Sequence, residues 1–384
     1  MDRAIGIEDT QVRQRRHRLR LSLVIGSYSL LLMVGAACAI PRTPLPPTPA
    51  PSSGIVVEDA LGRTVTIESP PQRIVIAGKA NFMLNDAIYA FPEAAERVVA
   101  LTKAQQSTAP FLPLLEPNYE AKLTLTLEST AEQIAAAQPD LVFLKQMMRE
   151  TVGKALEAAG IPVVYLSLET PEQYERDIAV LGEIFANPQR AEAIQDSYQN
   201  RMDRIKDALA GLDVSDRPSA LVLQTTTEGE VIAFEVPPTT FIQTRMVELS
   251  GGDPVWAEAS AGGWTVVGLE QIAAWNPDRI FVISYFQKVD DVIAQLTADP
   301  AWQGLAAVQQ EQVFGFPGDF YSWDQPDSRW ILGLTWMATK MHPEQFSDVD
   351  MSREIKAFYG ELYGLDEETV EAEVLPLLVG DVAR

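Results

Sequence analysis

The sequence predicts an α/β fold of two similar three-layer lobes, each with a mostly parallel sheet, joined by one long helix. Three observations predict it: a duplicated segment, strand-length apolar runs that alternate with helical patterns, and one long amphipathic helix near the middle of the chain. Strands that alternate with helices are typical of parallel sheets covered by helices on both faces.

The duplicated segment gives the two lobes. TAEQIAAAQPDLVFL at residues 130–144 recurs as GLEQIAAWNPDRIFV at residues 268–282, which sets Glu132 and Glu270 138 residues apart. Each copy predicts a short amphipathic helix, a Pro-Asp stop and an apolar strand. The spacing is about one domain length, whereas solenoid repeats recur every 20 to 50 residues or so. Two lobes of this kind make a cleft between them.

Both halves of the chain follow the same plan. A predicted hairpin at residues 56–68 precedes strand-like runs at 73–78, 97–101, 141–144 and 163–167, with helical patterns at 81–91 and 150–160. The second half has strand-like runs at 220–224, 231–236, 279–284 and 312–316. The pattern predicts an N-terminal lobe over residues 55–187 and a C-terminal lobe over residues 213–345.

One helix connects the lobes. Residues 188–212 carry apolar side chains at steps of three and four, with Pro188 at the start and Gly211 near the end. This is the pattern of one amphipathic helix of about 23 residues, roughly 35 Å long. A single rigid connection favours a small rocking motion over wide hinge closure. After the lobes, residues 346–384 predict two short helices at 354–365 and 367–380, to which the sequence assigns no function.

Residues 1–38 predict an export signal. Five arginines between residues 13 and 20 precede an uncharged stretch at 21–39 that ends in small residues before Cys38. Cys38, the only cysteine of 384 residues, resembles the lipidated cysteine of a lipoprotein signal, although Gly35 stands where that motif usually has Leu. Ordinary cleavage after Ala39, or an uncleaved anchor of roughly 20 residues, is the alternative. We expect a protein outside the cytoplasm, either anchored to the outer face of the cell membrane by this lipid or periplasmic.

A proline-rich tether follows at residues 39–54, with six prolines between residues 41 and 53. Such a segment builds no core and acts as a semi-rigid spacer between a membrane and the folded part. The formal net charge of −23 disfavours nucleic acid and anionic lipid headgroups as partners, so any membrane attachment must come from the N-terminus.

The composition argues against an enzyme. The two histidines are His17 and His342, so a Ser-His-Asp triad would depend on His342, and three or four His or Cys ligands for zinc are not available. We therefore expect no catalytic residues, no metal site of the protein's own and no cofactor. A hydrolase based on carboxylates stays open, because Asp and Glu are abundant.

These features together resemble a known family. The motifs are EDALGRTVTI at residues 58–67, PPQRIVIAG at residues 70–78, the two EQIAAxxPD copies, the connecting helix and the lipoprotein-like N-terminus. They resemble the substrate-binding proteins of ABC importers for iron-siderophore, haem, cobalamin and related metal complexes, the class with a helical backbone. The resemblance covers roughly residues 56–346. It implies a monomer that captures a metal complex between its lobes and delivers it to a permease.

In that family a glutamate of each lobe docks onto arginines of the permease, and the matching positions are Glu132 and Glu270. Local stability is the alternative for Glu132, because Ser129 and Glu132 match a capping box. The second copy has Val267 and Gly268 in place of the hydroxyl residues, and Glu270 is still present. Capping alone therefore does not explain the pair.

Ligand-binding candidates follow from position, because ligands of α/β sheets lie beyond the carboxyl ends of strands. These positions hold Lys79, Asn81, Lys145, Gln146, residues 225–227, Tyr285 and Phe286. The loop at residues 315–330 adds Tyr321, Trp323 and Arg329, and Trp264 follows two glycines. Aromatic side chains beside an arginine suit an apolar-edged, partly anionic ligand, or they hold the loop on its lobe.

Two ligand classes fit these candidates. A ferric siderophore, haem or corrinoid requires a cleft of roughly 300 to 1,000 Å³, whereas molybdate or tungstate requires a pocket of a few water volumes lined by cations and N–H groups. We expect the metal complex. A tethered ligand sensor or scaffold that works without a permease is the alternative of another class.

Overall fold

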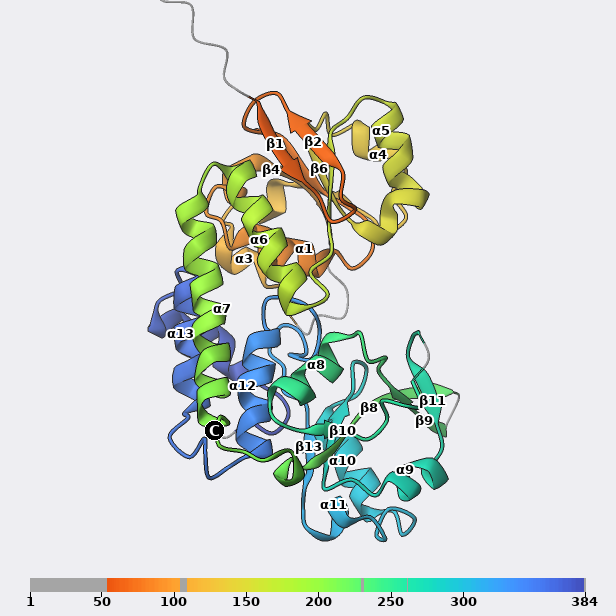
Figure 1. Cartoon of the computed structure of the whole chain (residues 1–384). Coiled ribbons are helices and arrows are strands. Elements are labelled where there is room, and N and C mark those ends of the chain that lie inside the picture. Colours follow the sequence, from red (N-terminus) through yellow and green to blue (C-terminus); the bar gives the residue numbers. More distant parts are fainter. Residues whose placement is uncertain (1–53, 104–108, 229–230, 261, 383–384) are drawn as a thin grey trace, which may run out of the picture. The chain divides into compact units, whose positions relative to one another are not determined.

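The computed structural model describes residues 54–103, 109–228, 231–260 and 262–382 (Figure 1). Residues Pro51–Arg384 form one compact unit. The predicted export signal with Cys38 and the tether up to residue 53 lie outside the described residues. Among the helices described, none combines the length and the apolar character that a membrane span needs.

The N-terminal lobe contains a hairpin and a parallel sheet. Strands β1 (Ile55–Glu58) and β2 (Thr64–Ile67) form the hairpin. The sheet has the order β5-β4-β3-β6-β7, and every neighbouring pair is parallel. Its strands are β3 (Ile74–Ile76), β4 (Val98–Thr102), β5 (Leu123–Leu125), β6 (Leu141–Lys145) and β7 (Val163–Leu166).

Helices cover both faces of this sheet, because its strands are apolar on both sides. Along β6, Leu141 and Phe143 pack with one cluster while Val142 and Leu144 pack with another. The first cluster includes α1 (Asn81–Tyr89) and α6 (Pro171–Phe185), and the second includes α4 (Ala131–Ala135) and α5 (Lys154–Ala158). Two short helices, α2 (Ala94–Arg97) and α3 (Leu112–Leu115), complete the lobe. The prediction of a three-layer α/β lobe is confirmed.

The C-terminal lobe has a mixed sheet of order β11-β9-β8-β12-β13, with β10 beside β8. Strands β8 (Ser219–Glu228), β10 (Asp253–Pro254), β12 (Arg279–Ile283) and β13 (Val313–Gly315) pair in parallel. Strand β9 (Val231–Val236) is antiparallel to both of its neighbours, β8 and β11 (Thr265–Val267). It returns from β8 as a hairpin without a crossover helix. The helices of this lobe are α8 (Ile242–Leu249), α9 (Leu269–Trp275), α10 (Val289–Ala298), α11 (Ala306–Gln309) and α12 (Trp330–Met341).

The two copies of the duplicated segment have the same local structure. Ile134 of α4 and Ile272 of α9 are both buried. The Asp140 carboxylate accepts hydrogen bonds from the backbone N–H groups of residues 72 and 73, at 2.7 and 2.9 Å, just before β3. The Asp278 carboxylate accepts from the N–H and hydroxyl of Ser219, at 2.9 and 2.7 Å, at the start of β8. Each copy therefore fastens its strand to the central strand of its own sheet.

Helix α7 (Pro188–Ala208) connects the lobes over 21 residues, with the Asn187 side chain capping its start. The chain after α12 packs along it, which the sequence did not predict (Figure 1). Arg201 and Arg204 of α7 form ion pairs with Glu354 and Glu361 of α13 (Met351–Tyr363), at 2.6 to 3.6 Å. Beyond α13, a short α14 (Glu367–Thr369) leads into irregular helical turns, where one regular helix was predicted. Several helices, and not α7 alone, connect the two lobes.

Candidate functional site

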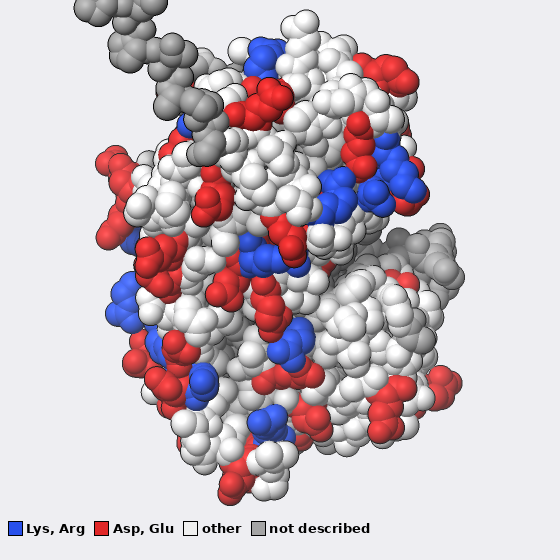
Figure 2. Space-filling model, turned by 45° about the horizontal axis from the view of Figure 1, so that its top comes forward, with Lys and Arg blue, Asp and Glu red and all other residues white. Residues whose placement is uncertain are grey.

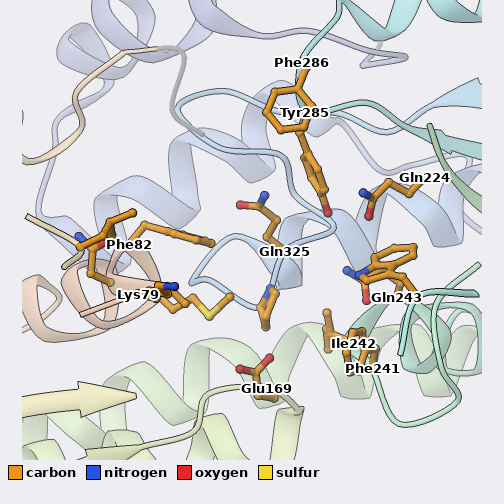
Figure 3. Close-up of a pocket in the computed structure, with 16 residues that line it drawn as sticks. Lys79, Phe82, Glu169, Gln224, Phe241, Ile242, Gln243, Tyr285, Phe286 and Gln325 are labelled. Atoms are coloured by element: carbon orange, nitrogen blue, oxygen red, sulfur yellow. The ribbon is translucent and has the colours of Figure 1, made fainter. Parts of the chain in front are cut away.

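A cleft of about 580 Å³ lies between the lobes (Figure 3). Its N-terminal wall comes from the turn between β3 and α1, the start of α1, the segment before α4 and the residue that follows the turn after β7. Its C-terminal wall comes from β8, the start of α8, the segment before β11, the turn after β12 and the loop before α12. The lining residues are Lys79, Ala80, Asn81, Phe82, Met83, Leu127, Glu169, Gln224, Phe241, Ile242, Gln243, Trp264, Tyr285, Phe286, Gln325 and Pro326.

The turn from β3 into α1 brings Lys79 to the cleft. Gly78 has φ +87°, and a side chain there would meet Met148 at 3.0 Å, so only glycine fits. Ala80 also lies in the left-handed region, at φ 52°, which is uncommon for a residue other than glycine. Lys79 stays more than half exposed, 3.7 Å from the Glu128 carboxylate. Lys79 therefore lines the cleft, and its role in ligand binding stays a prediction.

Aromatic rings form much of the cleft surface. Phe82 stacks on Tyr321 with ring centroids 5.1 Å apart, and Trp264 meets Phe241 edge-on at 6.3 Å. Phe286 is 78% exposed, although it is a large apolar side chain. An exposed ring at the wall of a concave site is suited to contact with an apolar ligand surface. Tyr321 does not itself line the cleft but supports Phe82 from behind.

A buried carboxylate orients polar groups of the C-terminal wall. Asp324 is fully buried and accepts hydrogen bonds from Tyr285 Oη at 2.6 Å and from Gln243 Nε2 at 3.1 Å. Burial raises the pKa of Asp324, against the lowering effect of its hydrogen bonds with Ser322, Tyr285 and Gln243. The Oε1 atoms of Gln224 and Gln243 are buried and have no hydrogen-bond partner among the described residues. Figure 3 shows the Gln224 amide directed into the cavity.

Lys145 lies behind the cleft and not in it, so its prediction as a ligand-binding cation is wrong. Its side chain is 1% exposed, because its Nζ atom bonds to the carbonyl of Ser167, to Met83 Sδ at 3.2 Å and to the Glu169 carboxylate at 2.6 Å. Burial lowers the pKa of Lys145, and Glu169 opposes this effect. Lys145 therefore contacts two residues that line the cleft, Glu169 and Met83, but does not line it itself.

Asn81 borders the cleft, but its side-chain amide donates inward to the carbonyl of Thr102. Thr225 is likewise used within its own lobe, where its hydroxyl donates to the carbonyl of Ile283 at 3.1 Å. These two strand-end residues hold the walls together. Of the strand-end candidates, Lys79, Tyr285 and Phe286 offer side-chain surface to the cavity.

Arg329 and Trp323 are fully buried, so their prediction as ligand contacts is wrong. The Arg329 guanidinium forms ion pairs with Asp86 of α1, with Asp319 at 2.7 Å and with Asp327 at 3.5 Å. It also donates to Tyr359 Oη of α13 at 2.9 Å. Trp323 donates to Asp319 at 3.1 Å. The aromatic loop therefore joins the two lobes, and only Gln325 and Pro326 of it reach the cleft.

Two helices begin at the cleft without a side-chain cap. Helix α1 starts at Asn81 and helix α8 at Ile242, and no capping side chain accepts a hydrogen bond from the first-turn N–H groups of either helix. Backbone N–H groups at a helix start favour oxygen atoms that carry negative charge. The cleft therefore combines aromatic walls, amide groups, two helix starts, one exposed lysine and one glutamate.

Comparisons with known proteins agree with this geometry. The family described as periplasmic binding protein matches residues 84–320. The chain belongs to the periplasmic binding protein family. The family and fold expected from the sequence are confirmed.

Particular relatives of this periplasmic binding protein bind different ligands. The chain is 26% identical over 343 residues to the molybdate-binding protein MolA of Haemophilus influenzae, which covers 80% of this chain and 90% of MolA. It is 27% identical over 268 residues to the Fe(3+) dicitrate-binding periplasmic protein FecB of Escherichia coli, over 67% of this chain and 80% of FecB. The crystal structure of the TroA-like periplasmic binding protein FepB from Veillonella parvula has the same fold, with a TM-score of 0.68, 20% identity and coverage of 81% and 97%.

The two glutamates suggested for docking are exposed in this periplasmic binding protein. Each occupies the second position of its helix, and α4 and α9 both lie on the side away from α7 (Figure 1). The cap of α4 is Thr130 with Gln133, so the predicted capping box of Ser129 with Glu132 is wrong. A hydrogen bond with the Thr130 hydroxyl lowers the pKa of Glu132. Neither glutamate forms an ion pair with a described residue.

Acidic side chains are not confined to these two helices. Figure 2 shows them widely over the visible face, with basic side chains among them. Several of the basic groups are paired, such as Arg149 with Glu150 and Glu157, and Lys154 with Glu150. Negative charge alone therefore does not distinguish Glu132 and Glu270 from other acidic residues. Their equivalent positions in the two lobes distinguish them.

Several lining residues were missed from the sequence. Glu169 follows the turn after β7, so the strand-end argument would have found it had it been applied to that strand. Gln224 lies in the long strand β8. Phe241 and Gln243 come from the start of α8, and no local signal marks them as ligand-facing.

Proposed function

We propose that this chain is the extracytoplasmic solute-binding subunit of an ABC importer, and that it carries a metal ion enclosed in an organic ligand. The observation that carries this proposal is the cleft of about 580 Å³ with aromatic walls and a few polar groups. That volume lies within the roughly 300 to 1,000 Å³ of drug-sized ligand sites. A ferric siderophore, haem or a cobalamin-like complex matches this size class.

The metal would arrive inside the ligand. Among the described residues, no three His, Cys, Asp or Glu side chains gather as a metal site. The part of the lining that the structure describes also contains no Ser, Cys or His side chain, which supports binding without chemistry. Aromatic rings such as Phe286 and Trp264 suit the apolar edges of an organic chelate.

A tetrahedral oxyanion is the second candidate. The similarity to MolA and the uncapped starts of α1 and α8 favour it. Of the described lining residues, Lys79 is the one cation and Glu169 the one carboxylate, and the volume is many times that of such an ion. These features favour the larger complex.

Delivery would use Glu132 and Glu270 as contacts for arginines of the permease, and Cys38 would carry the lipid that anchors the protein outside the cytoplasm. Exposed ion pairs contribute roughly 0.2 to 1 kcal/mol each, which suits a contact that must release after delivery. Two equivalent carboxylates on separate lobes would let a permease sense the relative position of the lobes. A sensor that works without a permease would not need the pair.

Binding is tested by titrating the purified chain, followed by tryptophan fluorescence, with a ferric siderophore, haem, cobalamin and molybdate. We expect one of the metal complexes to bind. Phe286→Ala should weaken it about tenfold or more, because burying a large apolar side chain contributes roughly 1.5 to 3 kcal/mol. Val214→Ala is the control, because Val214 is 76% exposed and lies outside the cleft. Saturable binding of molybdate, with no binding of the metal complexes, would contradict the proposed ligand and support the oxyanion.

Docking is tested with the double variant Glu132→Ala, Glu270→Ala. We expect ligand uptake into cells or proteoliposomes with the cognate permease to be abolished, while affinity for the ligand in solution is unchanged. Glu96→Ala with Glu258→Ala removes two other exposed carboxylates and should transport normally. Normal transport by the first variant would contradict the docking role.

A further inference from the structure

The cleft presents hydrogen-bond acceptors whose orientation the protein fixes. Glu169 follows the turn after β7, and its carboxylate is 37% exposed at the cavity. Figure 3 shows it directed into the space between Lys79 and Ile242. Lys145 Nζ, buried behind it at 2.6 Å, occupies one side of the carboxylate. An ionised carboxylate accepts hydrogen bonds and donates none, so its free side favours a ligand that turns a donor toward it.

Gln243 provides a second acceptor, and its side-chain amide is held in one orientation. Its Nε2 atom donates to the Asp324 carboxylate at 3.1 Å, and that carboxylate also accepts from Tyr285 at 2.6 Å and from Ser322 at 2.5 Å. Turning the amide would place its oxygen against the Asp324 oxygen, so Oε1 stays directed away from Asp324. Gln243 is 3% exposed and this oxygen has no partner among the described residues. A buried acceptor without a partner costs about 1 to 3 kcal/mol, which a donor from a ligand would recover.

Gln224 adds a third acceptor, on the same wall as Gln243. It is 9% exposed, and its Oε1 atom also has no partner among the described residues. Its amide can present either end, so it adapts to the ligand and does not select it. Glu169 and Gln243 are therefore the groups that can discriminate.

We propose that Glu169 and Gln243 determine specificity, by selecting a metal complex that turns hydrogen-bond donors, such as ammonium, hydroxyl or amide N–H groups, toward them. This inference rests on the proposed function. The starts of α1 and α8 take the oxygen atoms of the same complex, since they offer N–H groups. The selected ligand carries both kinds of group on one surface.

A fully deprotonated oxyanion satisfies only half of this site. Molybdate brings acceptors alone, so it meets the helix starts and Lys79 but leaves Gln243 Oε1 without a donor. It also repels Glu169, whose ion pair among the described residues is with the buried Lys145. The acceptors Glu169 and Gln243 thus favour a metal complex with donors over an oxyanion.

The test uses two ferric trihydroxamates, one with a free pendant ammonium and the same complex N-acetylated, together with sodium molybdate. Affinities are measured by tryptophan fluorescence for the wild type, Glu169→Gln, Gln243→Met and the control Glu175→Gln. Glu175 is exposed on α6, outside the cleft, and its loss changes the net charge equally.

We expect the wild type to bind the ammonium form at least about tenfold more tightly than the acetylated form, since hydrogen bonds to charged groups contribute roughly 1.5 to 3 kcal/mol. Glu169→Gln should remove this ratio, and Glu175→Gln should keep it. Gln243→Met should weaken both ferric complexes by about threefold to tenfold and keep the ratio, because it removes a neutral acceptor.

A ratio that Glu169→Gln leaves unchanged, with ferric complexes still bound, would overturn the inference and leave the proposed function intact. If Glu169→Gln does not fold, unchanged affinity of Gln243→Met for both complexes overturns it equally. Wild-type protein that binds neither trihydroxamate contradicts it as well. Failure of every metal complex in the earlier titration would instead overturn the proposed function.

Discussion

The two lobes differ in how their sheets continue beyond a shared centre. In the N-terminal lobe β3 is flanked by β6 and β7 on one side and by parallel β4 on the other. In the C-terminal lobe β8 is flanked by β12 and β13 in the same parallel way, but on the other side β9 is antiparallel and β10 is short. Of the part that is alike, the duplicated segment covers β6 and β12 with the helix that precedes each.

This difference separates two groups of residues. The residues that the copies share, such as the buried isoleucines and the aspartates that fasten β3 and β8, build each lobe locally. The cleft walls and the joint between the lobes come from residues without a counterpart, such as Gln243 and Arg329. The shared glutamates are the exception, because they are exposed and form no ion pair with a described residue. Their exposure is compatible with the docking role proposed for them.

The largest effect on stability should come from the joint between the lobes, which is the set of buried ion pairs around Arg329. Arg329→Leu leaves Asp86, Asp319 and Asp327 buried without their cation, which should lower the free energy of unfolding by about 3 to 5 kcal/mol. Urea unfolding measures it. Arg217→Leu at an exposed position should change stability by less than about 0.5 kcal/mol. A similar small change for Arg329→Leu would show that the lobes do not depend on this joint.

The shared aspartates should have matched effects. Asp140→Ala and Asp278→Ala each remove two hydrogen bonds at a strand start and should each cost about 1 to 2 kcal/mol. Urea unfolding of the two variants makes the comparison, with the exposed Glu192→Ala as control. Values that differ by more than about 1 kcal/mol would contradict the equivalence of the copies.

The joint should also respond to pH. Burial raises the pKa of Asp86 to about 6, against the lowering effect of Arg329. Since this value lies above that of an unfolded aspartate, about 3.9, the proton binds the folded state more tightly. The resulting stability is fully present below about pH 4 and is lost as pH rises through about 6. Wild-type protein should therefore lose about 1 kcal/mol between pH 5 and pH 7 through this group.

Urea unfolding at pH 5, 6 and 7 measures this dependence. Asp86→Asn removes the titrating group and should flatten the profile over that range. An equal slope in the variant would assign the pH dependence to other groups, such as Asp327, whose pKa burial also raises.

The smallest effects should come from the helix starts, where the copies differ by one hydroxyl. Thr130→Ala removes the cap of α4 and should cost about 1 kcal/mol. Gly268→Ser adds a hydroxyl at the start of α9, where φ is −90° and the nearest atom to a new side chain belongs to the exposed Glu270. It should stabilise by a few tenths of a kcal/mol. Thermal unfolding compares the two, and a destabilised Gly268→Ser would show that the starts are not equivalent.

Sequence patterns sufficed where a feature depends on neighbours in the chain. The alternation of apolar runs predicted most of the strands of both sheets, and β9 was predicted as a strand although its direction was not. The spacing of apolar residues predicted α7. Position after a strand predicted Lys79, Tyr285 and Phe286 at the cleft. Periodicity and strand ends are local properties, so one stretch of sequence carries them.

The sequence by itself determined the two lobes, their connection and the equivalent places of Glu132 and Glu270. Only the tertiary structure decided whether a polar side chain reaches the cleft or is buried against residues distant in the sequence. Arg329 lies in an aromatic loop that suits a ligand, but Asp86, 243 residues away, and Tyr359 bury it. Lys145 ends an apolar strand, and Glu169 from another turn neutralises it behind the wall. A buried charge requires its partner, and which partner arrives is set by how distant segments pack.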